Sequence, residues 1–198
     1  MKDRIEKLLE QEAKAIKRIP IDEEYEKAII LLFDSIHRKH GKLIASGMGK
    51  AGQIAQNIAT TFSSTGTPAI FLHPSDAQHG DLGIIQNNDI ILLVSNSGKT
   101  REILELFKLS RNLYPEIPII VLTGNRDSPL GELADAVLFT GNPAEVCPLG
   151  LTPTTSTTTM TVIGDILVVL MMERIKFSNQ DYAKRHHGGY LGRKSRSE

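Results

Sequence analysis

The chain has 198 residues, which suffices for one α/β domain with a substantial core but hardly for two. Its 23 basic and 23 acidic residues give a formal net charge of zero, and Trp is absent, so we expect no nucleic-acid partner. The only cysteine, Cys147, excludes an internal disulfide and favours a reducing compartment.

The sequence offers no segment that would direct the chain to a membrane. The first 16 residues are amphipathic and charged, unlike a signal peptide. The most apolar segment, Met160 to Met172, contains Gly164 and Asp165 and is too short to span a bilayer. We expect a cytoplasmic protein with no membrane partner.

Residues 1–40 predict a pair of helices ahead of the main domain. Apolar side chains recur at helical spacing over residues 3–18, and Pro20 ends the pattern. Asp22 can cap a second helix, which Gly41 closes. We expect this pair to pack on the domain or on a neighbouring subunit.

Five short apolar segments follow, each ending in a turn. They span residues 42–46, 69–72, 90–95, 117–122 and 136–139. Their alternation with helical patterns predicts a three-layer αβα sandwich around a five-stranded parallel sheet, in the flavodoxin-like order 2-1-3-4-5. The ligand crevice of such a sheet lies between strands one and three. We place this domain at residues 41–185 and treat 186–198 as a C-terminal tail.

The stretch from Asp89 to Glu102 predicts an anion site. An uncharged strand over 90–95 leads into the polar turn Ser95–Gly98, and a helical pattern begins at about Thr100. The unpaired N–H groups of that helix start face whatever lies above the strand end. Such turns also occur in ordinary loops, but the position at a strand end, opposite a second glycine turn, favours a phosphate.

The second turn, Gly47-x-Gly49-x-x-Gly52, fits the dinucleotide fingerprint only in part. The fingerprint needs an acidic residue at the end of the second strand, where this chain has His73. The Walker pattern of nucleotide hydrolases is absent from the sequence. We therefore expect no cofactor.

Four further side chains have useful chemistry but are ordinary individually. Lys50 and Glu102 follow the two turns, Glu145 lies in a loop after the last strand, and His186 follows the final helices. Most Lys and Glu side chains are solvated, and a His can belong to a solvated tail. The Thr-rich stretch 154–159 opens the last long helix, where hydroxyls can cap the helix or line a polyol site.

Five longer motifs run through the chain. They are SGMGKAG at 46–52, STGTPAIFLHPSDAQHGDLG at 64–83, VSNSGKTREI at 94–103, EVCPLGLTPTTSTTT at 145–159 and HHGGYLGRK at 186–194. With them the chain resembles the sugar isomerase (SIS) domain of D-arabinose-5-phosphate isomerases from about residue 40 to 194. The last two motifs are far more specific than the glycine turns.

This resemblance implies an aldose–ketose isomerase that interconverts D-ribulose 5-phosphate and D-arabinose 5-phosphate through an enediol. Such an enzyme supplies the eight-carbon acid Kdo for lipopolysaccharide. The resemblance also implies a sugar phosphate as the small-molecule partner. It further implies a homotetramer whose active sites are shared between subunits.

The resemblance also assigns site residues. The implied substrate and phosphate positions are Ser46, Gly66, Thr67, His73, His79, Ser95, Asn96, Ser97 and Thr100. His73 also matches a position that takes inhibitory zinc in the family. The implied catalytic positions are Lys50, Glu102, Glu145 and His186.

The reaction defines what those four side chains have to do. One carboxylate shuttles a proton between neighbouring carbons, and burial is expected to raise its pKa towards the working pH. We favour Glu145 over Glu102 for this role. Lys50 suits the developing oxyanion, and His186, contributed by a neighbouring subunit, suits ring opening.

The chain departs from the family pattern at three places. Lys99 stands where relatives often carry Glu, His187 replaces a usual Pro, and the sequence stops at Glu198 where many relatives continue into paired CBS domains. Two alternatives stay open: a non-catalytic sugar-phosphate sensor, and an SIS isomerase of another sugar phosphate. The residues leave undecided the exact substrate, the shuttle carboxylate, the mode of regulation and the oligomeric state beyond a non-monomer.

Overall fold

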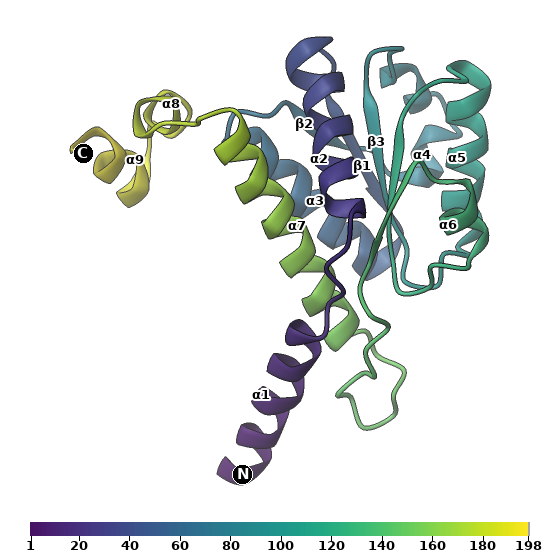
Figure 1. The fold of residues 1–198 in the computed structure, drawn as a ribbon, viewed down its shortest axis with the longest axis vertical. Helices are drawn as coiled ribbons and strands as arrows, with labels where there is room; N and C mark the ends of the chain where they lie inside the picture. The colour runs from purple at the N-terminus through teal and green to yellow at the C-terminus, as the bar shows by residue number, and fades with distance from the viewer. Residues whose placement is uncertain (198) are drawn as a thin grey trace.

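The computed structural model describes residues 1–197, and the side chains of residues 1–196. One sheet of five parallel strands has the order β2-β1-β3-β4-β5, which confirms the predicted order (Figure 1). The strands are β1 (Leu43–Gly47), β2 (Ala69–Phe71), β3 (Ile90–Val94), β4 (Ile119–Thr123) and β5 (Ala136–Phe139). All residues of β1, β3 and β4 are buried, as in strands covered on both faces.

Helices cover both faces of this sheet, which confirms the three-layer sandwich (Figure 1). The α-helices are α1 (Lys2–Lys17), α2 (Glu24–Phe33), α3 (Gly49–Ser64), α4 (Pro74–Ala77), α5 (Arg101–Leu113), α6 (Pro129–Leu133), α7 (Thr155–Arg174), α8 (Asn179–Arg185) and α9 (Gly189–Ser197). A π-helical turn, η1 (Asp34–Arg38), extends α2, and a 3₁₀ turn, η2 (Asp81–Ile84), precedes β3.

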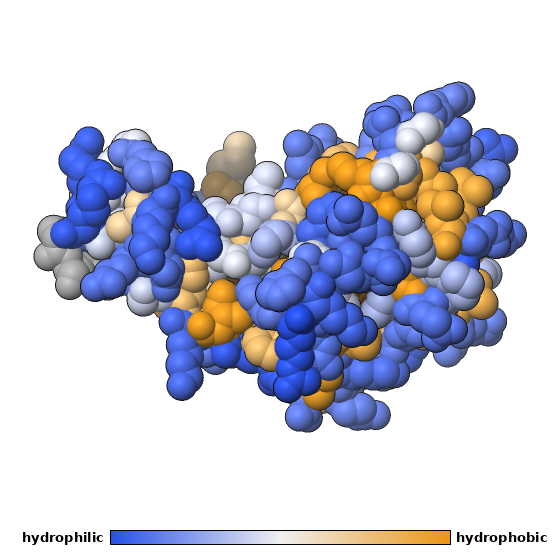
Figure 2. All heavy atoms as spheres, turned by 90° about the horizontal axis from the view of Figure 1, so that it is seen from above, coloured by the Kyte–Doolittle hydropathy of each residue, from blue (hydrophilic) through white to orange (hydrophobic). Residues whose placement is uncertain are grey.

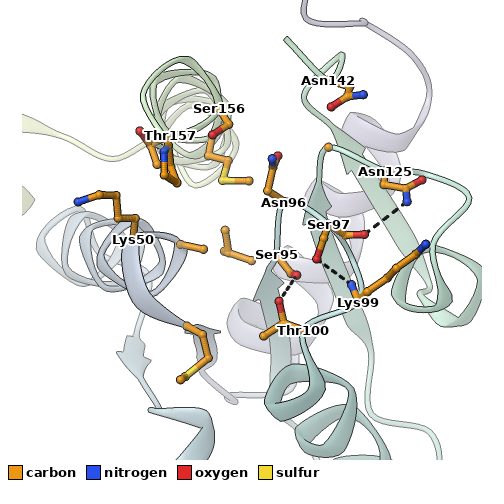
Figure 3. Close-up of a pocket in the computed structure, with 16 residues that line it drawn as sticks. Lys50, Ser95, Asn96, Ser97, Lys99, Thr100, Asn125, Asn142, Ser156 and Thr157 are labelled. Carbon is orange, nitrogen blue, oxygen red and sulfur yellow. Dashed lines mark hydrogen bonds between the residues drawn. The ribbon is translucent and has the colours of Figure 1, made fainter. Parts of the chain in front are cut away.

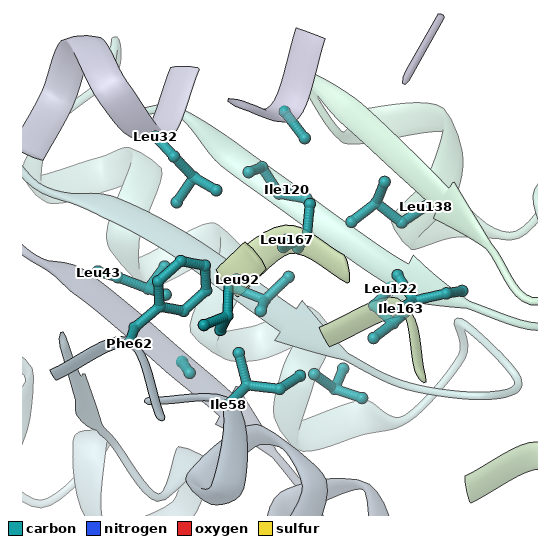
Figure 4. Close-up of a cluster of buried hydrophobic side chains, with 14 of the residues drawn as sticks. Leu32, Leu43, Ile58, Phe62, Leu92, Ile120, Leu122, Leu138, Ile163 and Leu167 are labelled. Carbon is teal, nitrogen blue, oxygen red and sulfur yellow. The ribbon is translucent and has the colours of Figure 1, made fainter. Parts of the chain in front are cut away.

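The core has two halves because successive strand residues point to opposite faces of the sheet. On one face α2, α3 and α7 pack against Leu43, Leu92 and Ile120, with Phe62 of α3 fully buried between them (Figure 4). On the other face α4, α5 and α6 cover the alternate residues, such as Ile44. Both faces are apolar, which explains why the central strands carry no charge.

The two edges of the sheet are closed in different ways. At β5, the backbone N–H of Val137 donates to Oε2 of Glu24 at 2.7 Å, so a side chain from α2 satisfies an edge donor. At the other edge, β2 has only three residues. Short strands and occupied edge donors are two ways to prevent pairing with another chain.

α7 is longer than the apolar segment seen in the sequence. Its 20 residues are long and apolar enough to cross a membrane by length and composition, which corrects the expectation that the segment is too short. Half of that helix is buried inside the structure, where it packs on α1, α2 and α3. The buried apolar residues of α7 therefore cover the sheet, whereas others, such as Val169, remain exposed.

Two parts of the chain extend beyond the sandwich (Figure 1). α2 covers the sheet, whereas the first half of α1 projects away, leaving Ile5 49% and Leu9 65% exposed. α8 and α9 lie beyond the C-terminal end of α7, away from the sheet (Figure 1). The predicted C-terminal tail from residue 186 therefore contains a helix over most of its described length.

Other differences from the expected elements are local. The polar loop after β2 contains α4 and η2, and the short helix α6 follows β4. At the end of η1 the left-handed residue is His40, with a φ of 59°. Gly41 is needed for space, because a Cβ there would lie 2.0 Å from the carbonyl oxygen of Asn88.

The crossing of α3 and α7 depends on a glycine. A Cβ on Gly164 would lie 2.5 Å from Cγ1 of Ile58, so Gly164→Ala is expected to lower the free energy of unfolding by about 1–3 kcal/mol. Ile58→Ala is expected to cost about 2–5 kcal/mol through the cavity it leaves. Because the new methyl would occupy that cavity, the double variant should lose less than the sum, as urea denaturation would measure. Strictly additive losses would contradict this close packing.

Candidate active site

A cavity of about 700 Å³ opens at the carboxyl ends of β1 and β3, where the sequence predicts the ligand crevice. Figure 3 shows Lys50 of α3 on one side and the turn from Ser95 to Thr100 on the other, with the start of α7 on a third side. The labelled polar residues in its lining are Lys50, Ser95, Asn96, Ser97, Lys99, Thr100, Asn125, Asn142, Ser156 and Thr157.

The turn after β3 is tied together by its own polar groups. Ser95 Oγ and Thr100 Oγ1 lie 2.9 Å apart, and the Lys99 N–H donates to Ser97 Oγ at 3.1 Å. Thr100 is the residue immediately before α5, as predicted. The first N–H groups of a helix lack intrahelical partners and carry its positive dipole end, so this turn is suited to an anion.

Gly98 gives the turn its close contact with α6. Its φ is +63°, and a Cβ there would lie 1.9 Å from Oγ of Ser128, which caps α6 by accepting a hydrogen bond from Gly131 N–H at 3.2 Å. The neighbouring strand end also holds the turn, because Gly124 N–H donates to the Asn96 carbonyl at 3.0 Å. A side chain in place of Gly98 would push the turn away from α6.

The charges around the cavity are all positive. Among the described residues that line it, Lys50 and Lys99 are charged, and the remainder are amides, hydroxyls or apolar groups, without Asp, Glu or His. Such a lining can hold an anion and stabilise negative charge. The described lining itself contains no carboxylate or imidazole that could act as a base.

Glu145 lies behind one wall of the cavity and holds the start of α7. Its Oε2 accepts hydrogen bonds from Thr154 N–H at 2.7 Å, Thr154 Oγ1 at 2.9 Å and Ser156 N–H at 3.3 Å. Burial raises the pKa of this carboxyl, but the hydrogen bonds from Ser156 and Thr154 outweigh it, and the pKa is lowered. The expectation of a raised pKa at Glu145 is therefore wrong for this arrangement.

The SIS domain family matches residues 35–170. The chain belongs to the SIS domain family. This confirms the family predicted from the motifs, and it agrees with the sheet order and with the cavity at the carboxyl edge.

Curated relatives share the same region. Arabinose 5-phosphate isomerase KdsD of Yersinia pestis is 47% identical over 174 residues, covering 88% of this chain and 51% of that protein. KdsD of Francisella tularensis is 43% identical over 174 residues, covering 88% and 52%. This chain thus spans about half the length of the curated relatives it matches.

Two solved structures align with this chain over nearly their whole length. A candidate phosphosugar isomerase involved in capsule formation from Bacteroides fragilis is 64% identical, with a TM-score of 0.94, and the match covers 95% of this chain and 98% of that one. The Escherichia coli CFT073 protein c3406 in complex with arabinose 5-phosphate is 33% identical, with a TM-score of 0.85 and coverage of 92% and 95%.

Five of the predicted SIS site residues line the cavity: Lys50, Ser95, Asn96, Ser97 and Thr100. Ser46 is fully buried near the end of β1 and does not line the cavity. Its Oγ has no hydrogen-bond partner among the described residues. Glu102 lies in the first turn of α5, half-buried, outside the cavity lining.

His186 lies far from the cavity of its own chain. It follows α8, where its ring stacks on Tyr182 with centroids 3.7 Å apart and its Nδ1 lies 3.0 Å from the Tyr182 carbonyl oxygen. α8 itself stands away from the sheet (Figure 1). The role of His186 in catalysis stays a prediction.

The other predicted substrate residues also lie outside this cavity. Gly66 and Thr67 follow α3 at its far end, where Thr67 Oγ1 is 3.1 Å from His37 Nε2. His73 lines a separate cavity of about 740 Å³ beside β2, and His79 is exposed between α4 and η2. Their contacts with substrate stay predictions.

The zinc interpretation of His73 also stays a prediction. Its Nδ1 lies 3.8 Å from Oδ2 of Asp76. Within residues 1–196, no group of three or more His, Cys, Asp or Glu side chains is placed to hold a metal.

Sequence reasoning missed two amides of the cavity wall. Asn125 follows β4 and Asn142 follows β5, and both line the cavity beside the turn from Ser95 to Thr100 (Figure 3). The rule that parallel strands deliver ligand-binding groups at their carboxyl ends would have found both. Asn142 has a further signal, since its φ of 48° places it in the left-handed region that Asn tolerates.

The hydrogen bonds of Glu145 predict a pH-dependent contribution to stability. Glu145→Gln removes a charged acceptor from the start of α7 and is expected to lower the free energy of unfolding by about 1 kcal/mol near pH 7. Because the folded-state pKa is lowered, this contribution is complete above the unfolded pKa and disappears as the pH falls through the folded one.

Urea denaturation of both proteins at about pH 7 and about pH 3 would measure this difference. Glu105→Gln, at an exposed carboxylate of α5, is the matched control and should have little effect. A loss that is equally large at both pH values would contradict the capping role.

Proposed function

We propose that this protein is an aldose–ketose isomerase that interconverts D-ribulose 5-phosphate and D-arabinose 5-phosphate. The observation that carries the proposal is a turn suited to an anion in a chain that is 33% identical to c3406 and aligns with 95% of its length; the structure of c3406 holds arabinose 5-phosphate. The identity of 43–47% with KdsD proteins over most of this chain supports the same reaction.

The phosphate of the substrate would sit at the turn from Ser95 to Thr100. There the hydroxyls and the start of α5 can meet its negative charge. From that anchor the sugar would extend towards Ser156 and Thr157 of α7, which line the same cavity. Asn96 could then hydrogen-bond sugar hydroxyls with either end of its amide.

The reaction moves one carbon-bound proton. A base removes it from the carbon beside the carbonyl, an enediolate forms, and the proton returns to the former carbonyl carbon while a hydroxyl proton crosses between the two oxygens. Lys50 is proposed to stabilise the enediolate oxygen, since its side chain lies across the cavity from the phosphate turn (Figure 3). No cofactor is needed for these steps.

The proton shuttle is proposed to be Glu102, which reverses the preference drawn from the residues alone. Glu102 starts the helix next to the phosphate turn, and no hydrogen bond involves its carboxylate among the described residues. Glu145 lies outside the cavity lining, and the three hydrogen bonds that its Oε2 accepts from the start of α7 favour the charged carboxylate over the protonated form. Glu145 instead supports catalysis by positioning Ser156 at the cavity wall.

Ring opening is proposed to use His186 from a second copy of the chain. Support comes from the lining of the cavity, which contains no His, Asp or Glu in the described part of one chain, and from the projection of α8 away from its own sheet. Apolar side chains on α1 and α7 remain exposed, such as Leu9 (65%) and Val169 (52%), and a homotetramer would cover them.

We further propose that the protein works in the cytoplasm and supplies Kdo for lipopolysaccharide. Phosphorylated sugars are metabolites of that compartment, and the KdsD name of the curated relatives supports the pathway. The division into a helical pair (1–40), an SIS domain (41–185) and a C-terminal segment carrying His186 is part of the same proposal.

Deuterium incorporation tests the reaction. In deuterated water, ribulose 5-phosphate should yield arabinose 5-phosphate with deuterium at C2, which NMR would detect.

Lys50→Met is expected to lower kcat/KM by about a hundredfold or more through loss of oxyanion stabilisation. Tight sugar-phosphate binding without turnover of any pentose phosphate would contradict the enzyme and support the sensor, and faster turnover of another sugar phosphate would contradict the named substrate.

Mixing two inactive variants tests the shared site. Lys50→Met and His186→Asn should each be inactive alone. After unfolding and refolding together at equal amounts, one site in each mixed pair is intact, so about a quarter of wild-type activity should return. Activity that stays at the level of the single variants would contradict a His186 contributed by a second copy.

A further inference from the structure

Two lysines give the cavity a positive charge that nothing else in its described lining offsets. Lys50 approaches from the start of α3 and Lys99 from the turn before α5, and their neighbours in the lining are uncharged. The whole chain has a formal net charge of zero, so this excess is local. Concave sites lined by one sign of charge concentrate the field and attract ligands of the opposite sign.

The backbone of Lys99 is held in place by a hydrogen bond, while its side chain is exposed to solvent. Its N–H donates to Ser97 Oγ at 3.1 Å, which holds the residue at the phosphate turn. Its side chain is exposed, and within residues 1–196 it forms no ion pair with a carboxylate. Figure 3 shows its amine on the side of the turn away from Lys50.

Two cations on opposite sides of one turn complement a group with two negative charges. A phosphate monoester carries close to two negative charges at pH 7. Each lysine is therefore attracted to it more strongly than to a carboxylate or another monoanion. A solvent-exposed lysine farther along α5 would not favour a dianionic ligand at the turn. Lys108 is the relevant comparison, because it is exposed on α5, nine positions after Lys99 and about two helical turns from the start of that helix.

We propose that Lys99 is a specificity-determining residue which, together with Lys50, selects ligands bearing a dianionic phosphate and speeds their capture. The identity of the natural ligand rests on the proposed function. The selection itself is a property of binding and can be measured without turnover.

The test compares Lys99→Gln and Lys99→Glu with the control Lys108→Glu in the full chain. Calorimetry would measure the affinity for inorganic phosphate and for arabinose 5-phosphate. At about 0.05 M salt, neutralisation of Lys99 should weaken both ligands about fivefold and charge reversal about twentyfold. At about 0.5 M salt the losses should shrink to about twofold, because screening removes the attraction. Lys108→Glu should stay within about twofold throughout, since distance and solvent both weaken the effect of an exposed charge about two helical turns along α5.

Two outcomes would overturn the inference. One is wild-type affinity in Lys99→Glu, and the other is a loss that does not depend on salt, which would mean a structural role. The proposed reaction is tested separately by turnover. If no sugar phosphate is isomerised but the salt-dependent loss remains, the function fails and this inference stands; if turnover is normal and Lys99→Glu binds like wild type, the inference alone fails.

Discussion

The candidate site depends on the hydrogen bonds that hold the turn after β3 against the end of β4. The Asn96 carbonyl accepts from both Gly124 N–H at 3.0 Å and Thr123 Oγ1 at 3.2 Å, and Gly98 packs directly on Ser128. These contacts use the backbone of the turn and leave hydroxyls and helix N–H groups available to a ligand. A site held in this way needs little reorganisation when an anion binds, which favours both affinity and catalysis.

Local signals in the sequence predict most of the fold and the anion turn. Uncharged strands of about five residues, separated by helical patterns, determine a parallel sheet because few other arrangements cover both of its faces. The position of Lys50 and of the Ser95–Thr100 turn then follows, since both come directly after strands that end at the same edge. Binding groups that lie next to one another in the chain are therefore the easiest part of a site to predict from the sequence.

The role of Glu145 could not be predicted in the same way. Its hydrogen-bond donors lie nine and eleven positions later in the chain, across a loop whose path no periodic pattern specifies. Whether burial or hydrogen bonding decides its pKa depends on those donors. His186 and Thr67 present a different difficulty, because they lie outside the cavity lining in the described structure, and sequence patterns do not show which distant elements pack together.

The closed edges of the sheet limit how this chain can associate. On β5, the Glu24 carboxylate accepts the hydrogen bond of the Val137 N–H. β2 has only three residues and so presents few free backbone groups. Neither edge therefore favours pairing with a strand of another molecule. In the proposed oligomer, contacts between copies would therefore use helical surfaces. Packed helices shift and rotate against one another more readily than paired strands do. If a site is shared between copies, small changes in helix packing would therefore move the residues of one copy relative to those of the other.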